Sequence, residues 1–97
     1  MEKQHLDFYD LIGKDSPEKV QMNIANNIKK IRKNKGMSQA ELAKASMVSF
    51  ASYRVFEKSG KIALSSLIRI AFALGIEGDF AKLFKPEEHI SYEEFFK

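Results

Sequence analysis

The fold is decided by residues 38–60, which read SQAELAKASMVSFASYRVFEKSG. Ser38 and Glu41 have the spacing of a capping box, in which the serine side chain caps a helix and the glutamate reaches back to the serine N–H. This predicts a short helix over 38–45. After a tight turn, a second helix is expected over 49–58, and the glycine at position 60 ends it.

The helix at 49–58 has two chemically different sides. Val48, Tyr53 and Phe56 are the expected core contacts. The residues left on the opposite side are Phe50, Ala51, Arg54, Val55 and Lys58. Two short helices joined by a tight turn predict a helix-turn-helix arrangement.

A longer helix is expected before this stretch. Ser16, Pro17 and Glu18 are typical of a helix start, with a capping serine, proline at the first helical position and an early acid. Gly36 fits the left-handed residue that follows a helix end. The apolar residues predicted to share one face of this helix are Val20, Ile24, Ile28 and Ile31.

Two further helical segments are expected after residue 60. The inward stripe of a fourth helix is formed by Leu67, Ile70, Ala71 and Leu74. Gly75 ends that helix. A fifth helical turn is predicted over 79–84, with Phe80 and Phe84 in the core because they are four residues apart, and Pro86 breaks it.

These elements predict an all-α fold: a compact five-helix domain over residues 16–85, with short extensions at both ends. Residues 1–15 form the N-terminal extension, in which 6–12 has the spacing of a short amphipathic helix. Residues 86–97 form an acidic, aromatic tail. Its Tyr92, Phe95 and Phe96 are expected to make a partner or dimer surface; the alternative is that they extend the bundle.

Charge is distributed unevenly along the 97 residues, whose net charge is +3. Residues 1–20 carry five acids against three lysines, and residues 76–97 carry six acids against three lysines. Residues 21–75 carry ten Lys or Arg against two glutamates, a net of +8. A basic middle between two acidic ends predicts a body that faces a polyanion, and the alternative is a simply solvated lysine face.

Several function classes are disfavoured. The chain has no cysteine, no apolar run long enough to span a membrane and no start typical of a signal peptide, so we expect a cytoplasmic protein without disulfides. His5 and His89 are isolated, and no glycine-rich phosphate motif is present. We therefore expect no enzyme activity, no cofactor and no metal site.

Residues 24–84 resemble the lambda/Cro repressor-like helix-turn-helix domain, also called XRE-type. The elements that carry the resemblance are I-x-x-x-R ahead of a glycine, S-Q-A-E-L-A, the V-S pair, a glutamate at position 57 and L-x-x-I-A-x-A-L-G. Within this family, residues 47–97 are similar to HipB-like antitoxins, which bind DNA and pair with HipA-type kinases. The resemblance implies a dimeric repressor on a palindromic DNA operator, with a HipA-like kinase as a possible partner. A stand-alone repressor and a protein-interaction module remain the alternatives.

A helix-turn-helix places its second helix in the major groove, so that helix supplies the expected DNA contacts. The predicted base contacts are Ser49, Phe50, Ala51, Arg54 and Val55, with Arg54 as the main reader of guanine. The predicted phosphate contacts are Gln39, Ser52, Lys58, Ser59 and Lys61. The resemblance further implies an inward ion pair between Arg32 and Glu57, which holds this helix and offers Arg32 to a phosphate.

Three positions depart from the family pattern. Met47 replaces the glycine common in the turn, where a left-handed residue other than glycine costs roughly 1 kcal/mol. Ala63 stands where a serine or proline usually starts the next helix, so its cap is weak. The DNA-reading helix opens with Phe50 and Ala51 in place of polar readers.

Overall fold

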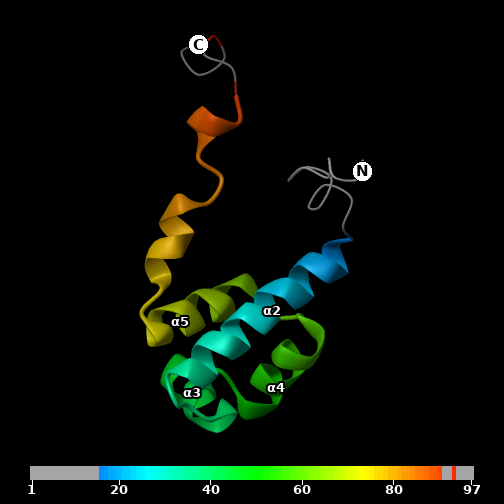
Figure 1. Cartoon of the computed structure of the whole chain (residues 1–97), viewed down its shortest axis with the longest axis vertical. Coiled ribbons are helices and arrows are strands. Elements are labelled where there is room, and N and C mark those ends of the chain that lie inside the picture. The colour runs from blue at the N-terminus through cyan, green and yellow to red at the C-terminus, as the bar shows by residue number, and fades with distance from the viewer. Residues whose placement is uncertain (1–15, 91–92, 94–97) are drawn as a thin grey trace, which may run out of the picture.

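The structure is a computed structural model that describes residues 16–90 and 93. Its described part is all-helical, without a strand, which confirms the predicted fold class. Along the chain lie α2 (Pro17–Asn34), α3 (Gln39–Ser46), α4 (Phe50–Ser59), α5 (Leu64–Leu74) and the 3-10 helices η2 (Glu77–Lys82) and η3 (Pro86–Glu88) (Figure 1). Within this part, no helix combines the length and hydropathy needed to cross a membrane. The segment predicted at 6–12 and the tail aromatics Tyr92, Phe95 and Phe96 lie outside the described residues.

The predicted helix caps are present. The Ser16 hydroxyl accepts a hydrogen bond from the Lys19 backbone N–H at 3.1 Å. The capping box of α3 is complete, because Ser38 Oγ accepts from the Glu41 N–H at 3.0 Å and the Ser38 N–H donates to Glu41 Oε1 at 2.8 Å. Ala63 begins α5 without a side-chain cap, as expected. Local sequence signals therefore set these helix boundaries.

The core lies where α2 and α5 enclose the helix-turn-helix formed by α3 and α4. α2 packs on α4, and α3 packs on both α4 and α5. Tyr53 and Phe56 of α4 are fully buried and meet edge to face with ring centroids 5.9 Å apart. The other buried apolar residues are Ala25, Ile28, Leu42, Ala43, Val48, Ile70, Ala71 and Leu74. The core contacts predicted for α4 and the inward stripe predicted for α5 are thus confirmed, with Leu67 partly buried. The stripe predicted for α2 is only partly right: Ile28 is buried, but Ile24 is 39% exposed, because the side of α2 that faces the core runs through Ala25, Ile28 and Arg32.

Gly60 is required where α4 ends. Its φ of +82° is left-handed, and a Cβ atom there would lie 2.7 Å from the backbone carbonyl carbon of Gln21 in α2. Any side chain would therefore force α4 and α2 apart. The close approach fixes the position of α4 against α2.

The structure corrects the expectations for the C-terminal part. The fifth helix is a 3-10 helix that ends at Lys82, and Pro86 begins η3 instead of only breaking a helix. Phe80 is half-buried, but Phe84 is 81% exposed, so placing Phe84 in the core was wrong. The physical reason is that the helix ends before Phe84, whose backbone is left-handed (φ 53°), so the two rings do not share a helix face. Every residue of 81–90 is exposed, and we call this segment the C-terminal arm.

Candidate nucleic-acid interface

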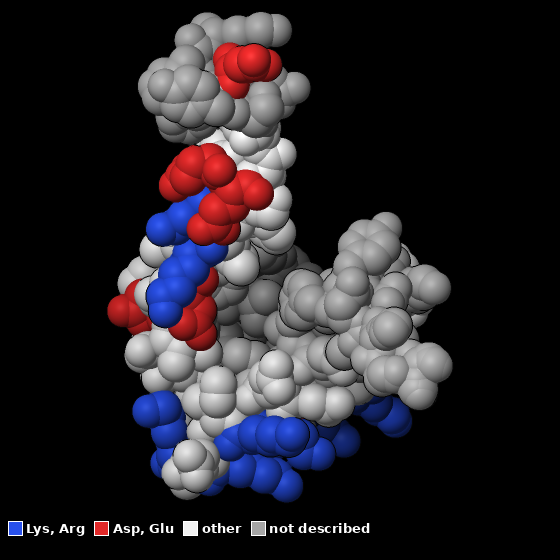
Figure 2. All heavy atoms as spheres, turned by 45° about the horizontal axis from the view of Figure 1, so that its top comes forward, with Lys and Arg blue, Asp and Glu red and all other residues white. Residues whose placement is uncertain are grey.

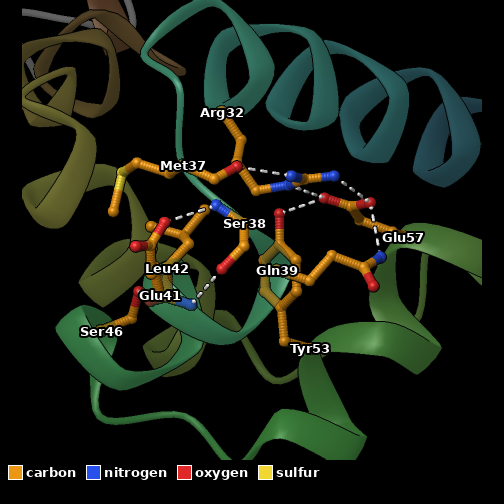
Figure 3. Close-up of polar contacts among 9 residues, drawn as sticks. All are labelled: Arg32, Met37, Ser38, Gln39, Glu41, Leu42, Ser46, Tyr53 and Glu57. Atoms are coloured by element: carbon orange, nitrogen blue, oxygen red, sulfur yellow. Dashed lines mark hydrogen bonds and ion pairs between the residues drawn. The ribbon is translucent and has the colours of Figure 1, made fainter.

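A buried polar cluster connects α4 to α2 and to the start of α3 (Figure 3). The Arg32 guanidinium binds the Glu57 carboxylate through Nε at 2.7 Å and Nη2 at 3.1 Å. The same carboxylate accepts from Gln39 Nε2 at 2.9 Å and from the Tyr53 hydroxyl. Arg32 and Glu57 are only 6% and 8% exposed, and no buried side-chain nitrogen or oxygen of the described residues lacks a partner. Every charge in the cluster is therefore compensated.

The cluster keeps Glu57 ionised. Burial raises the pKa of Glu57, but hydrogen bonds from Arg32, Tyr53 and Gln39 outweigh it and hold the pKa below its usual value. The hydrogen bond to Glu57 raises the pKa of Arg32. Burial, together with the neighbouring carboxylate, raises the pKa of the Tyr53 phenol. At neutral pH the pair is therefore a full ion pair beside a protonated phenol.

The Arg32 side chain is buried and makes its hydrogen bonds inside the protein, whereas its contact with a phosphate stays a prediction. Its Nη1 donates to the backbone oxygen of Met37 at 2.7 Å, in the loop between α2 and α3. Together with the two bonds to Glu57, this engages all three guanidinium nitrogens. Arg32 therefore ties α2 to α4 and to the loop before α3.

The outer face of α4 is open to solvent. Phe50 and Val55 are 49% and 53% exposed, and Ala51 and Arg54 are exposed between them. The Arg54 guanidinium carbon lies 5.6 Å from the centre of the Phe50 ring, which is a cation–π distance. Ser49 caps the helix by accepting from the Ser52 N–H at 3.0 Å. All five residues predicted to contact bases thus lie at the start of α4 or on its outer face.

The structure brings one group of predicted contacts together in a hollow beside α4. Gln39, Arg54 and Lys58 line it, along with Lys29 of α2 and with Glu57, whose carboxylate is paired with Arg32. The Gln39 amide donates one N–H to Glu57, so only its second N–H is left for a phosphate, next to the first backbone N–H groups of α3. Three cations around the start of a helix form a surface that favours an anion.

A second hollow on the other side of α4 contains Ala51, Ser52, Val55 and Lys61. Ser52 and Lys61 are exposed. The Ser59 hydroxyl instead donates to the Val55 backbone oxygen at 2.7 Å and accepts from the Lys61 N–H at 3.2 Å. The Ser59 hydroxyl proton is therefore engaged in a hydrogen bond at the end of α4. Lys61 is better placed than Ser59 to bind a phosphate.

Sequence reasoning missed three contributors. Tyr53 was expected only as a core residue, although its position four residues before Glu57 is the spacing at which helix side chains meet. Lys29 entered only through the net charge of residues 21–75, without a role of its own. Arg69 donates from Nε to the Ser46 backbone oxygen at 3.0 Å, which ties the end of α3 to α5, and no local pattern indicates that contact.

Surface charge divides the molecule. Figure 2 shows lysine and arginine gathered over the end formed by α3, α4 and the last turns of α2, whereas acids and a few lysines alternate along η2 and the C-terminal arm. The exposed cations of the basic end include Lys29, Lys30, Lys33, Lys35, Lys44, Arg54, Lys58 and Lys61. No group of three or more potential metal ligands occurs among residues 16–90. The outer face of α4 thus lies at the end of the molecule where these cations gather.

Comparison with protein families gives a match to the helix-turn-helix model over residues 28–80, more than half of the chain. The match spans α3, α4, α5 and the end of α2, which are the elements that build the cluster and the basic surface. Comparisons with curated proteins and with solved structures gave no match. The matched family is one of DNA-binding proteins and not of enzymes. The chain therefore belongs to the XRE-type, lambda/Cro repressor-like helix-turn-helix family of DNA-binding transcription regulators.

Proposed function

We propose that this protein is a sequence-specific repressor that binds a palindromic operator as a homodimer. The observation that carries the proposal is the outer face of α4, where an arginine and apolar side chains are exposed inside a cationic surface. Arg54 reads guanine through O6 and N7, and Phe50, Ala51 and Val55 contact thymine methyl groups. Repression follows if the bound dimer occludes a promoter.

Phosphate contacts fix the position of α4 along the duplex. Lys58, Lys29 and Gln39 flank α4 on one side, and Ser52 and Lys61 flank it on the other. Such contacts carry no sequence information, but they supply most of the salt-dependent affinity. The buried pair of Arg32 and Glu57 holds α4 at the angle at which both sets reach the duplex.

The operator test is a nuclease footprint of the protein on its own upstream DNA. A dimer predicts two protected half-sites related by a two-fold axis and about one helical turn, ~34 Å, apart. A single protected half-site, or protection without sequence preference, would contradict the dimeric repressor.

A finer proposal is that the protein is a HipB-like antitoxin that represses its own operon and binds a HipA-like kinase. The similarity of residues 47–97 to such antitoxins supports it, as does the exposed C-terminal arm with Leu83, Phe84 and Ile90 at its surface. Co-expression with a kinase encoded beside the gene, followed by co-purification and a kinase assay, tests it. If the kinase neither co-purifies nor loses activity, the stand-alone repressor is the remaining hypothesis. If the protein binds a partner but no DNA, it is instead a protein-interaction module.

A further inference from the structure

The outer face of α5 differs from that of an ordinary solvent-facing helix. Its sequence, LSSLIRIAFAL, contains a single charged residue. That residue, Arg69, donates to the Ser46 backbone oxygen and to the Ser66 hydroxyl. Its polar residues, Ser65, Ser66 and Arg69, share one side of the helix, and the remaining sides are apolar. In the described structure, α5 is covered only on its inner side, where Ile70, Ala71 and Leu74 are buried.

Three apolar residues form a stripe along the uncovered side. Leu64 and Phe72 are 66% and 64% exposed, and Ile68 between them is partly exposed. Because they are four residues apart, they lie on one helix face about 6 Å from one to the next along the axis. We call these three residues the α5 stripe.

The apolar surface continues from the α5 stripe toward α2. Leu67 and Ala71 of α5 line a hollow of about 240 Å³ together with Ile24 and Ile31 of α2, and its lining is otherwise apolar except for Asn27 and Asp79. Ile24 remains 39% exposed at the edge of this hollow. The stripe is therefore part of a wider apolar face, larger than scattered surface residues would give.

We propose that the α5 stripe is the contact between two copies of this chain, with their α5 helices antiparallel about a two-fold axis at Ile68. The α5 stripe is symmetric in spacing about Ile68. An antiparallel pairing places Phe72 of one copy against the partner's Leu64, and Ile68 against the partner's Ile68, so the same patch serves both copies. The proposal rests on the dimer in the proposed function and names its surface.

Charge favours a second copy over other occupants. The α5 stripe itself carries no ionisable group, and the one cation beside it, Arg69, donates to the Ser46 backbone oxygen and to the Ser66 hydroxyl. The stripe therefore offers a charged peptide or a nucleic acid little to pair with. The cations of the basic end belong to α2, α3 and α4 and to Lys61, and the acids of the arm come after α5 in the chain (Figure 2). A copy seated on the α5 stripe therefore leaves the outer faces of both α4 helices uncovered. A domain of this size also gains stability from burying such a face.

Sedimentation equilibrium of the full chain without DNA tests the contact. The wild type should be a dimer at micromolar concentration, and Leu64→Asp or Ile68→Asp should raise its dissociation constant by at least about tenfold. The matched control is Phe84→Asp, which adds the same charge at an exposed aromatic of the arm and should leave the dimer intact. Circular dichroism melts of each variant separate loss of association from loss of fold.

Cysteine trapping tests the geometry directly, because the natural chain contains no cysteine. Under mild oxidation Ile68→Cys should form a disulfide dimer, since the two-fold axis brings both copies of that residue together. Leu64→Cys and Phe72→Cys should cross-link when mixed but not alone. Ser52→Cys, exposed on α4, is the control that should not cross-link.

Three results would overturn the proposal. The wild type could sediment as a monomer, with melting temperatures lowered by the stripe variants, which would show that the chain's own ends cover the α5 stripe. A dimer unaffected by the stripe variants would place the contact elsewhere. Self-cross-linking of Leu64→Cys would mean parallel helices.

Binding of each variant to a short mixed-sequence duplex at low salt keeps the two hypotheses separate. A stripe variant that becomes a monomer should still bind this duplex through α4, because non-specific affinity needs only the cationic face. Loss of DNA binding by an intact dimer would instead count against the proposed function.

Discussion

α4 and α5 are neighbouring helices of ten and eleven residues with similar inner faces and opposite outer faces. Each buries three residues in the same core: Tyr53, Phe56 and Glu57 for α4, and Ile70, Ala71 and Leu74 for α5. Outside, α4 presents Arg54 and Lys58 beside apolar side chains, whereas α5 presents the apolar α5 stripe, with Arg69 as its one charged residue. The inner faces of the two helices thus build the shared core, whereas their outer faces determine which kind of partner each helix contacts.

The largest expected effect comes from the inner face of α4. Glu57→Gln removes the carboxylate that compensates the buried Arg32 guanidinium, and breaking such a pair costs roughly 3–5 kcal/mol of the free energy of unfolding. Urea denaturation followed by circular dichroism measures the loss. Glu87→Gln, the same change in the exposed arm, should have no effect. Equal stability of both variants with the wild type would show that the pair does not hold α4.

The next largest loss of stability is expected at the end of α4. Gly60→Ala combines a left-handed backbone, which costs about 1 kcal/mol, with a clash against the Gln21 backbone. Gly36→Ala is the matched control, because Gly36 is also left-handed (φ +72°) but has no atom within 4 Å of a built Cβ. The difference between the two unfolding free energies isolates the contact between α4 and α2. Equal losses would show that this contact yields without cost.

The pH dependence of stability tests the role of Glu57 on the inner face of α4. Because the folded pKa of Glu57 lies below its ordinary value of 4.5, its contribution is complete above that pH and is lost as the pH falls through the folded value. The raised pKa of Tyr53 acts in the opposite direction, with stability lost above its ordinary value of 10.0. Urea midpoints measured from pH 7 downward should fall less steeply for Glu57→Gln than for the wild type. Parallel curves would contradict the assignment of the acid loss to Glu57.

The turn between α3 and α4 gives a smaller effect of opposite sign. Met47 has a left-handed backbone (φ 59°) and is 82% exposed, so its side chain contributes little packing. Met47→Gly should therefore raise the free energy of unfolding by up to about 1 kcal/mol. Met47→Ala keeps a Cβ in the same backbone and should not gain. Thermal melts of both variants and the wild type test this: the melting temperature should rise for Met47→Gly and not for Met47→Ala.

The contrast between the helices also shows how far the sequence leads. Capping residues and apolar spacing act over a few positions, which is why the capping box of Ser38 and the inner stripes of α4 and α5 could be predicted. Phe84 was misplaced because spacing alone does not tell a 3-10 turn from a continued helix. The internal contacts of Gln39 and Arg69 join elements 18 and 23 residues apart, and no local pattern reports them. The α5 stripe was missed because one helix carries two apolar faces and periodicity indicates only the stronger.

The central claim is that the outer face of α4 reads DNA, and Arg54→Ala measured across a salt series tests it most directly. Fluorescence anisotropy on the protein's own upstream duplex and on a scrambled duplex gives the sequence preference at each salt concentration. Wild-type affinity should fall steeply with salt, and Arg54→Ala should lose about 1–3 kcal/mol of discrimination between the two duplexes. Lys85→Ala, which removes one positive charge from the arm, should leave discrimination unchanged. An Arg54→Ala protein that still prefers its operator as strongly as the wild type would contradict the account.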